Sequence, residues 1–357
     1  MHSSYAKVSV LVPTYNYGRY LPQTLNSILA QEDVDFELLV SDDASTDNSA
    51  EIIRSYARRD KRIRFKLHEK NLGMVENWNW CLKEARGEYI KYVFGDDALT
   101  SRQSLGRFVY LLDLHPEATI ATSSRLIVND ASTPTEIWDD LRFPGVYTGQ
   151  SLIYRCLWQD RNLIGEPTAV MVRRSAIGRP FDVALRQLVD MEMWFYLLSQ
   201  GDLVYEPTPL CAFRSHDQQQ TIHNRHSHVG PQESLRITAR YFAEASECAT
   251  ASWHPLQRRQ IIYRRLYYSA KRVARTPEVI SQEAVLNNCL TPPWRLACWG
   301  LHRMGRPFKN LGYALSKRAN TLRLRPRPRD LDISAFVDVY SSSESCPVVG
   351  FKQTKLA

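Results

Sequence analysis

Two pairs of adjacent aspartates stand at the ends of apolar runs in the N-terminal third of the chain. Asp42 and Asp43 follow the run FELLVS, and Asp96 and Asp97 follow the run EYIKYVFG. Ionised carboxylates beside an apolar core cost free energy unless a cation or a hydrogen-bonding partner compensates them. Mg²⁺ and Mn²⁺ prefer carboxylate oxygen, whereas helix capping, the alternative role, needs only one of two neighbouring aspartates. Capping does not explain a second pair after another strand, so the pattern favours a cation site.

Four strand patterns alternate with three helix patterns and set the positions of these carboxylates. Continuous apolar runs predict the strands, and apolar residues at helical spacing predict the helices. The predicted strands cover residues 7–16, 36–43, 63–69 and 88–95, and the predicted helices cover residues 20–31, 45–59 and 74–86. This βαβαβαβ order predicts an α/β fold with a doubly wound, mostly parallel, Rossmann-like sheet. Ligands of such sheets bind beyond the carboxyl ends of the strands, where PTYN, SDDAS and GDDA fall.

Composition and charge bound the class of protein. The 357 residues are 44% apolar and 24% charged, as in globular proteins, and a formal net charge of +8 favours anionic partners. The seven cysteines are scattered without a CxxC pair, which indicates reduced thiols rather than disulfides or a zinc site. Neither a signal-peptide pattern nor a membrane-spanning apolar window is visible. We therefore expect a cytoplasmic protein, or one peripheral at the inner face of the plasma membrane.

The C-terminal third differs in character from the region before it. Residues 223–330 contain amphipathic helix patterns rich in Arg and Tyr, and residues 331–357 are rich in serine. We expect a main domain at residues 1–222, a basic α-helical extension at 223–330 and a flexible tail at 331–357. The basic helices suit an anionic membrane surface, with a solvated helical subdomain or a homodimer contact as alternatives. No nucleic-acid-binding module is recognisable, so nucleic acid is not an expected partner.

The order of the motifs VLVPTYN, LLVSDDASTD, NLGMVENWN, GEYIKYVFGDDAL, VDMEMW and FRSH resembles glycosyltransferase family 2 over residues 7–220. Members of this family are inverting enzymes with a GT-A fold, of the kind that builds bacterial cell-surface polysaccharides. The resemblance implies a nucleoside-diphosphate-sugar donor, Mg²⁺ or Mn²⁺, and a glycan or lipid-linked acceptor. It predicts a catalytic role for residues 1–222. The Q-x-x-R-W signature of processive synthases is not found, so we expect a non-processive enzyme.

The resemblance also implies roles for the residues on the donor side. Asp97 matches the family's metal ligand and Asp96 the residue near the ribose, while Arg214 and His216 match a basic pair near the diphosphate or the metal. Many relatives carry Arg at the position of Asn77, so positive charge for the diphosphate has to come from elsewhere. Arg214 and Lys91 are the candidates. The same resemblance places nucleoside contacts in the family at Pro13, Thr14, Tyr15 and Asp43.

Asp43 matches a carboxylate that accepts a hydrogen bond from the base, which suits uracil or thymine and therefore favours UDP or dTDP. On the acceptor side, Asp190 matches the carboxylate that deprotonates the acceptor hydroxyl. Glu192 is the alternative base, although a residue two positions along a helix points away. The alternative for both Asp190 and Glu192 is that they are surface acids on an amphipathic helix. Glu166 either contacts the acceptor or has a structural role.

Two other classes of protein stay open from the sequence. A sugar-1-phosphate nucleotidyltransferase shares an α/β nucleotide fold and a metal, but it should carry a glycine-rich basic loop after the first strand, where this chain has PTYNYGRY. A non-catalytic nucleotide-sugar-binding protein would keep Tyr15 and Asp43 and would need no base. Replacement of Asp190 separates this second class from an enzyme.

Overall fold

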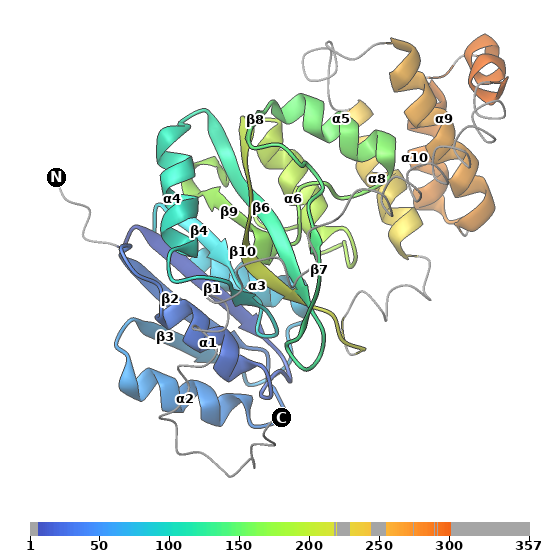
Figure 1. Ribbon diagram of the computed structural model, residues 1–357. Helices are drawn as coiled ribbons and strands as arrows, with labels where there is room; N and C mark the ends of the chain where they lie inside the picture. The colour runs from blue at the N-terminus through green and yellow to red at the C-terminus, as the bar shows by residue number, and fades with distance from the viewer. Residues whose placement is uncertain are drawn as a thin grey trace.

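The structure is a computed structural model. It describes residues 6–217, 219, 229–243, 255–273, 275–288, 290 and 292–300. These residues form one mixed sheet of ten strands with helices on both faces and a group of helices at one end (Figure 1). Along its main path the sheet has the strand order β3-β2-β1-β4-β9-β6-β10-β5. The expected α/β class is confirmed.

The N-terminal half of the sheet is parallel, as the alternating pattern predicts. Its strands are β1 (Val8–Thr14), β2 (Phe36–Asp42), β3 (Ile63–Leu67) and β4 (Tyr89–Tyr92). In the register, Thr14 pairs with Asp42, so β1 and β2 end level with each other. Parallel strands that end together place their following loops side by side. The loops PTYN, SDDAS and GDDA therefore meet at one edge of the sheet.

The other half of the sheet is mixed, which the strand-helix alternation did not predict. Strand β9 (Val170–Arg173) runs antiparallel between β4 and β6 (Ala118–Val128), and β10 (Asp202–Arg214) runs parallel to β6. Three short strands pair antiparallel with these: β5 (Ala98–Leu99) and β8 (Gly145–Tyr147) with β10, and β7 (Pro134–Trp138) with β6. The parallel sheet is thus extended by a mixed sheet, and GDDA lies where the two halves meet.

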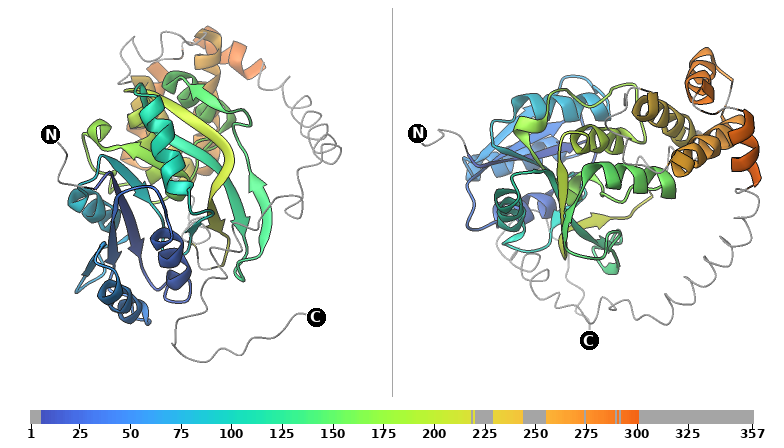
Figure 2. Two further views of the ribbon diagram at one scale, coloured as in Figure 1. Left: turned by 60° about the vertical axis from the view of Figure 1, so that its left-hand side comes forward. Right: turned by 90° about the horizontal axis from the view of Figure 1, so that it is seen from above.

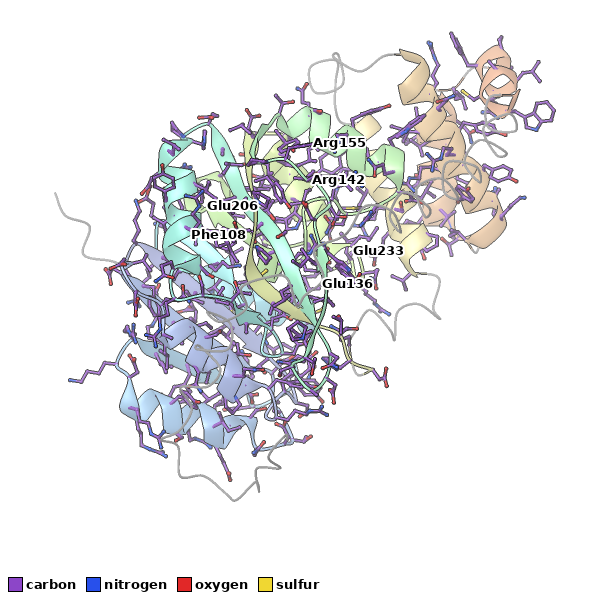
Figure 3. The ribbon with its side chains drawn as sticks, viewed as in Figure 1. Phe108, Glu136, Arg142, Arg155, Glu206 and Glu233 are labelled. Atoms are coloured by element: carbon purple, nitrogen blue, oxygen red, sulfur yellow. The ribbon has the colours of Figure 1, made fainter. Side chains whose placement is uncertain are left out.

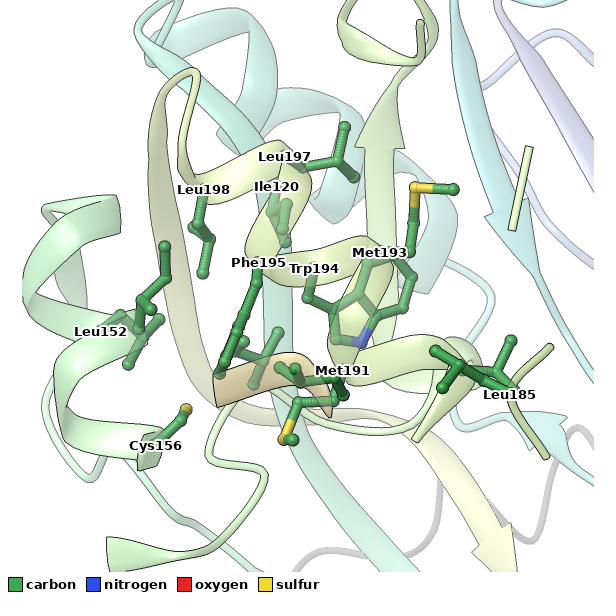
Figure 4. Close-up of a cluster of buried hydrophobic side chains, with 14 of the residues drawn as sticks. Ile120, Leu152, Cys156, Leu185, Met191, Met193, Trp194, Phe195, Leu197 and Leu198 are labelled. Atoms are coloured by element: carbon green, nitrogen blue, oxygen red, sulfur yellow. The ribbon is translucent and has the colours of Figure 1, made fainter. Parts of the chain in front are cut away.

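Helices cover both faces of the sheet and form two apolar layers. The helices are α1 (Leu21–Leu29), α2 (Ser49–Arg59), α3 (Met74–Glu84), α4 (Ser104–Leu114), α5 (Gly149–Gln159) and α6 (Val189–Leu198). One layer contains residues of α1, α2 and α4, and the other contains residues of α3, α5 and α6. Trp194 and Phe195 of α6 lie at the centre of the second layer (Figure 4). Burial of such a side chain contributes about 1.5–3 kcal/mol, so α6 is firmly anchored.

The C-terminal helices pack against the α6 side of the sheet domain. They are α8 (Val229–Ala243), α9 (Pro255–Arg272) and α10 (Pro277–Asn288), and a further helical segment covers residues 292–300. Leu235 of α8 and Ile262 of α9 belong to the same apolar layer as Trp194. Figures 1 and 2 show α8, α9 and α10 together at one end of the molecule. The helical extension and the sheet domain therefore share a core.

The predicted tail at residues 331–357 lies outside the described part of the chain. Among the helices that are described, none combines the length and apolarity that crossing a membrane requires.

Candidate active site

The loops after β1 and β4 are packed tightly together at the carboxyl edge of the sheet. A Cβ atom added to Gly95 would lie 2.5 Å from Oγ1 of Thr14 and 2.9 Å from its Cβ. Any other residue at position 95 would push the two loops apart, because contacts this short do not occur between real side-chain atoms. The glycine therefore lets the carboxylates that follow it lie beside the PTYN loop.

Asp97 is buried, with 2% of its surface exposed. Its Oδ1 accepts a hydrogen bond from the backbone N–H of Arg214 at 3.0 Å, and its Oδ2 accepts one from the hydroxyl of Thr168 at 2.5 Å. Burial raises the pKa of Asp97 well above its ordinary value, and the neighbouring charge of Asp96 raises it further. Each oxygen of Asp97 thus has a protein donor, and its ionised form is penalised unless a cation is near.

Asp96 lies beside His216. The Oδ2 atom of Asp96 and the Nε2 atom of His216 are 3.0 Å apart, and both side chains are buried. Two aromatic rings lie beside the imidazole, with ring-centroid distances of 5.8 Å to Tyr17 and 5.1 Å to Tyr20. The carboxylate that converges with His216 is therefore that of Asp96, although the sequence interpretation paired His216 with Asp97 as metal ligands.

The donor set at this edge fits a divalent cation that is shared with a substrate. Asp96 and His216 bring a carboxylate oxygen and an imidazole nitrogen together, and Asp97 is the next residue. Over the described ranges, no group of three or more His, Cys, Asp and Glu side chains is placed so that it could hold a metal ion by itself. Mg²⁺ is commonly held by one or two carboxylates, with phosphate oxygens and water completing its shell. The residues present suit that incomplete arrangement, while the individual ligand roles of Asp97 and His216 stay predictions.

Arg214 and Lys91 are buried with their charged groups bonded inside the protein, and their expected roles toward a diphosphate stay predictions. Arg214 is 1% exposed, and its guanidinium donates to the backbone carbonyl of Asp96 at 2.8 Å and to the hydroxyl of Ser132 at 2.8 Å. Lys91 is 0% exposed, and its amine donates to the carbonyl of Val170 at 3.2 Å. Burial lowers the pKa of Lys91 to about 8. Both cations satisfy internal carbonyl groups because those groups have no access to water.

The expected nucleoside side of the site contains one exposed aromatic ring and one buried carboxylate. Tyr15 is 45% exposed, whereas Pro13 and Thr14 are the last two residues of β1 and are buried. Asp43 is buried, and its two oxygens accept hydrogen bonds from the N–H groups of Leu72 at 2.7 Å and Gly73 at 3.0 Å. Asp43 therefore holds the loop before α3. A base that contacts this carboxylate has to share oxygens that already accept backbone bonds.

Asn77 stands in a buried polar network. The hydroxyl of Ser41 donates to Oδ1 of Asn77 at 2.6 Å and lies 3.0 Å from Nε2 of His68. His68 and Ser41 were not singled out from the sequence, and no motif marks them. The network leaves little room for the arginine that many relatives carry at position 77.

Asp190 is the second residue of α6. Its Oδ2 accepts a hydrogen bond from Nδ2 of Asn162 at 3.2 Å, and its Oδ1 accepts one from the N–H of Met191 at 2.8 Å. Burial raises the pKa of Asp190 to about 7, and the charge of Glu166 raises it while Arg125 lowers it. A carboxylate with a pKa near neutrality can accept a proton efficiently at physiological pH.

Glu166 and Glu192 both have structural partners. Oε2 of Glu166 lies 2.7 Å from Nε of Arg125, a buried residue of β6. Oε1 of Glu192 lies 2.7 Å from a guanidinium nitrogen of Arg179 and also pairs with Arg240. Glu192 is therefore held in the interior by two arginines and does not face the same space as Asp190.

A short segment links the two sides of the site. Asn162 contacts Asp190, and Thr168, in the 3₁₀ turn Pro167–Ala169, contacts Asp97. The carbonyl of Thr168 also accepts a bond from Lys91. In this segment the sequence marks only Glu166 as a candidate, because hydroxyl and amide side chains carry no motif. One segment of the chain therefore fixes both carboxylates relative to each other.

Comparison with known proteins gives a consistent family match. Residues 9–179 match the family described as "Glycosyl transferase family 2". The chain is 34% identical over 223 residues to the uncharacterized protein MT1568 of Mycobacterium tuberculosis, covering 58% of this chain and 66% of that protein. It is 28% identical over 198 residues to TuaG of Bacillus subtilis, a glycosyltransferase named for teichuronic acid biosynthesis, covering 56% of this chain and 74% of TuaG.

Other matches are shorter or more distant. The uncharacterized glycosyltransferase EpsJ of Bacillus subtilis is 40% identical over 94 residues, and the chain spans 27% of it. The chain thus spans 66% and 27% of the lengths of MT1568 and EpsJ. The crystal structure of Staphylococcus aureus TarS 1–349 in complex with UDP-GlcNAc superimposes with a TM-score of 0.53 at 18% identity, covering 84% of this chain and 92% of that chain. A likeness at this identity shows a shared fold.

Proposed function

The chain contains a glycosyltransferase family 2 domain with the GT-A fold, and from that membership we propose that it is an inverting, metal-dependent glycosyltransferase. Its donor is a nucleoside-diphosphate-sugar, with UDP or dTDP favoured. Its acceptor is a hydroxyl of a glycan or a lipid-linked sugar in cell-surface polysaccharide synthesis. The UDP-GlcNAc and UDP bound to TarS and the name of TuaG support the donor and acceptor classes.

One observation carries the proposal more than any other. The segment from Asn162 to Thr168 contacts two carboxylates. Asn162 bonds to Asp190, whose pKa is near 7, and Thr168 bonds to Asp97 at the predicted donor side. A transferase needs a base and a leaving-group site at a fixed separation, because a displacement requires both reactants in line. A protein that only binds nucleotide sugars has no need of the base.

The reaction follows from these positions as a single displacement. An oxygen of Asp190 accepts the proton of the acceptor hydroxyl while the hydroxyl oxygen bonds to the anomeric carbon. The bond from the anomeric carbon to the diphosphate oxygen breaks on the opposite face, so the configuration inverts and the nucleoside diphosphate leaves. A Mg²⁺ or Mn²⁺ ion held by Asp97, His216 and the neighbouring Asp96 would stabilise the negative charge of the leaving group. Arg125 pairs with Glu166 and so offsets the negative charge that Glu166 places near Asp190.

Nucleotide binding tests the proposal directly. With Mn²⁺ present, we expect at least one of UDP-GlcNAc, UDP-glucose, UDP-galactose and dTDP-glucose to raise the melting temperature of the full chain, and GDP-mannose to do so less. A ligand at 100 times its dissociation constant stabilises by about 2.7 kcal/mol, which a thermal melt detects easily. If no sugar nucleotide shifts the melting temperature, the proposal is wrong. Binding without any release of nucleoside diphosphate favours the non-catalytic alternative.

A lipid-linked acceptor would bring the basic helical region to an anionic membrane surface. In the described segment 292–300, Leu296 is 70% exposed, and exposed apolar residues beside basic ones suit the interface of a bilayer. We expect Leu296→Glu to weaken sedimentation of the full chain with phosphatidylglycerol vesicles by about tenfold, because burial of a leucine contributes about 1.5–3 kcal/mol. The matched control is Leu114→Glu, since Leu114 of α4 is also exposed.

Equal binding by both variants and the wild type would contradict membrane attachment. A change of molar mass in light scattering for Leu296→Glu would instead support a homodimer contact. Deletion from residue 231 onward is a poor test of the same hypothesis, because it also removes α8, which packs against α6.

A further inference from the structure

Glu233 of α8 holds the turn that begins α6. Its carboxylate accepts backbone hydrogen bonds from Arg186, from Gln187 at 2.9 Å and from Leu188 at 2.8 Å. Glu233 is 6% exposed and lies where the C-terminal helices meet the sheet domain (Figure 3). Three donors on one buried carboxylate are a strong set of charge-assisted hydrogen bonds. The contact joins two segments that are far apart in the sequence.

The N-cap residue of α6 provides no side-chain cap. The N-cap residue is Leu188, and within the described residues its side chain makes no capping hydrogen bond. The first N–H groups of a helix need an acceptor, and a negative charge there is favoured by the helix dipole. Glu233, on another helix, accepts the N–H of the N-cap residue Leu188 and places its negative charge beside the start of α6, while its bonds from Arg186 and Gln187 hold the turn just before the helix. Asp190 stands two residues after Leu188, so the turn that Glu233 holds leads directly into the first turn of α6, which carries the Asp190 carboxylate.

Further contacts of α8 hold the same part of α6. Arg240 pairs with the buried carboxylate of Glu192 and with Asp182, at 3.2 Å for the latter. The hydroxyl of Tyr241 donates to the backbone carbonyl of Glu192 at 3.1 Å. Glu192 lies one half-turn after Asp190. The first turn of α6 is therefore held on both sides of Asp190 by residues of α8.

We propose that Glu233 is a positioning residue for the base Asp190, so that α8 belongs to the machinery that activates the acceptor. The proposal rests on the role of Asp190 in the proposed function. Its physical basis is that a carboxylate acting on a hydroxyl has to be held to within a fraction of an ångström. Glu233 acts through the backbone of residues 186–188 and does not touch a substrate. It explains why a helical region outside the nucleotide-binding sheet is packed into the core of the domain.

The matched variants are Glu233→Gln and Glu283→Gln. Gln keeps the shape of Glu233, but its amide nitrogen faces backbone donors, so at least one of the three hydrogen bonds is lost. Glu283 has the same burial in α10, where it accepts from Ser269 at 2.9 Å and pairs with Arg275 at 2.6 Å. It holds α10 to α9 and not to α6. A general loosening of the helical region therefore affects both variants, and a positioning effect only the first.

Amide hydrogen exchange and steady-state kinetics of the full chain test the proposal. In Glu233→Gln we expect exchange at residues 186–188 to rise at least about tenfold, and kcat to fall about tenfold to hundredfold. The KM for the sugar nucleotide and the affinity for UDP with Mn²⁺ should stay within about twofold, because the donor side is untouched. Glu283→Gln should change none of these. The kinetics use the sugar nucleotide that stabilises the protein most in the melting screen.

Any of three results would overturn the proposal. The first is an unchanged exchange rate at residues 186–188, and the second is an equal kcat in the two variants. The third is a loss of UDP affinity in Glu233→Gln that matches its loss of kcat, which indicates a general structural role. Absence of sugar-nucleotide turnover in the wild type counts against the proposed function instead, and the exchange measurement still decides whether Glu233 holds the turn.

Discussion

Asp190→Asn should abolish sugar transfer and leave donor binding intact. The amide cannot accept the proton of the acceptor hydroxyl, and removal of a general base lowers kcat by about 10²–10⁴-fold. The measurement is kcat with the selected sugar nucleotide, next to the affinity for UDP with Mn²⁺. Because Asp190 lies on α6 and not at the ends of β1, β2 and β4, UDP affinity should stay within about twofold.

The wild-type pH profile follows from the same residue. Burial and the charge of Glu166 raise the pKa of Asp190 to about 7, against the charge of Arg125. A base works in its ionised form, so kcat should rise with pH and reach half its maximum near pH 7. Because the pKa of Asp190 is higher in the folded than in the unfolded chain, the free energy of unfolding falls as the pH rises from the ordinary pKa of an aspartate to about 7.

Glu206→Gln is the matched control for Asp190→Asn. Glu206 is a buried carboxylate of β10 that pairs with Arg107 of α4 at 2.7 Å, on the α4 side of the sheet (Figure 3). Its replacement should lower stability and leave kcat and the pH profile unchanged. Undiminished turnover in Asp190→Asn, or an acid limb that persists there at pH 7, would refute the assigned base.

The parallel half of the sheet could be predicted from the sequence because its signals are local. The predicted strand at residues 36–43 corresponds to β2 (Phe36–Asp42), and the predicted helix at 74–86 to α3 (Met74–Glu84). The pairing of β9 between β4 and β6 joins segments that are far apart in the chain. Strand periodicity identifies such segments but does not choose their neighbours or direction. The mixed half of the sheet was therefore not predictable by the same reasoning.

The positions of the carboxylates followed from the strand ends, but their surroundings did not. The sequence indicates that Asp96 and Asp97 lie at the sheet edge. It does not indicate that Asp97 receives bonds from Thr168 and Arg214 while Asp96 turns to His216. The side-chain direction after a strand ends depends on tertiary contacts. By contrast, the separation of Asp190 from Glu192 follows from helix geometry, and the partners of Glu192 agree with it.

The buried positions of Lys91 and Arg214 could not be predicted from the sequence, for the same physical reason in each case. Both are basic residues near the carboxylates in sequence or space, and net charge makes such residues attractive as phosphate ligands. Their charged groups instead satisfy backbone carbonyls inside the protein. Whether a long basic side chain reaches outward or inward depends on which buried acceptors lack partners. That balance is set by packing, which composition and motif order do not contain.

Asp97→Asn should make the metal-free protein more stable and the metal-loaded protein inactive. Burial raises the pKa of Asp97 well above its ordinary value, so the fold disfavours its ionised form at neutral pH. The amide keeps the shape and can still accept the N–H of Arg214. Without metal, we expect the melting temperature to rise by about 2–4 °C for each kcal/mol of relieved burial cost. With Mn²⁺ and UDP, the stabilisation seen in the wild type should be lost.

Asp43→Asn provides the contrast that makes this result specific. Asp43 is an equally buried carboxylate that follows β2, on the other side of β1 from β4, but its two oxygens accept backbone N–H bonds from Leu72 and Gly73. An amide can satisfy only one of those donors through its oxygen, so this variant should melt below the wild type. Opposite shifts for Asp97→Asn and Asp43→Asn would separate a carboxylate kept for a cation from one kept for the fold. A lowered melting temperature in Asp97→Asn with an intact response to Mn²⁺ would show that Asp97 is structural and that Asp96 and His216 hold the ion without it.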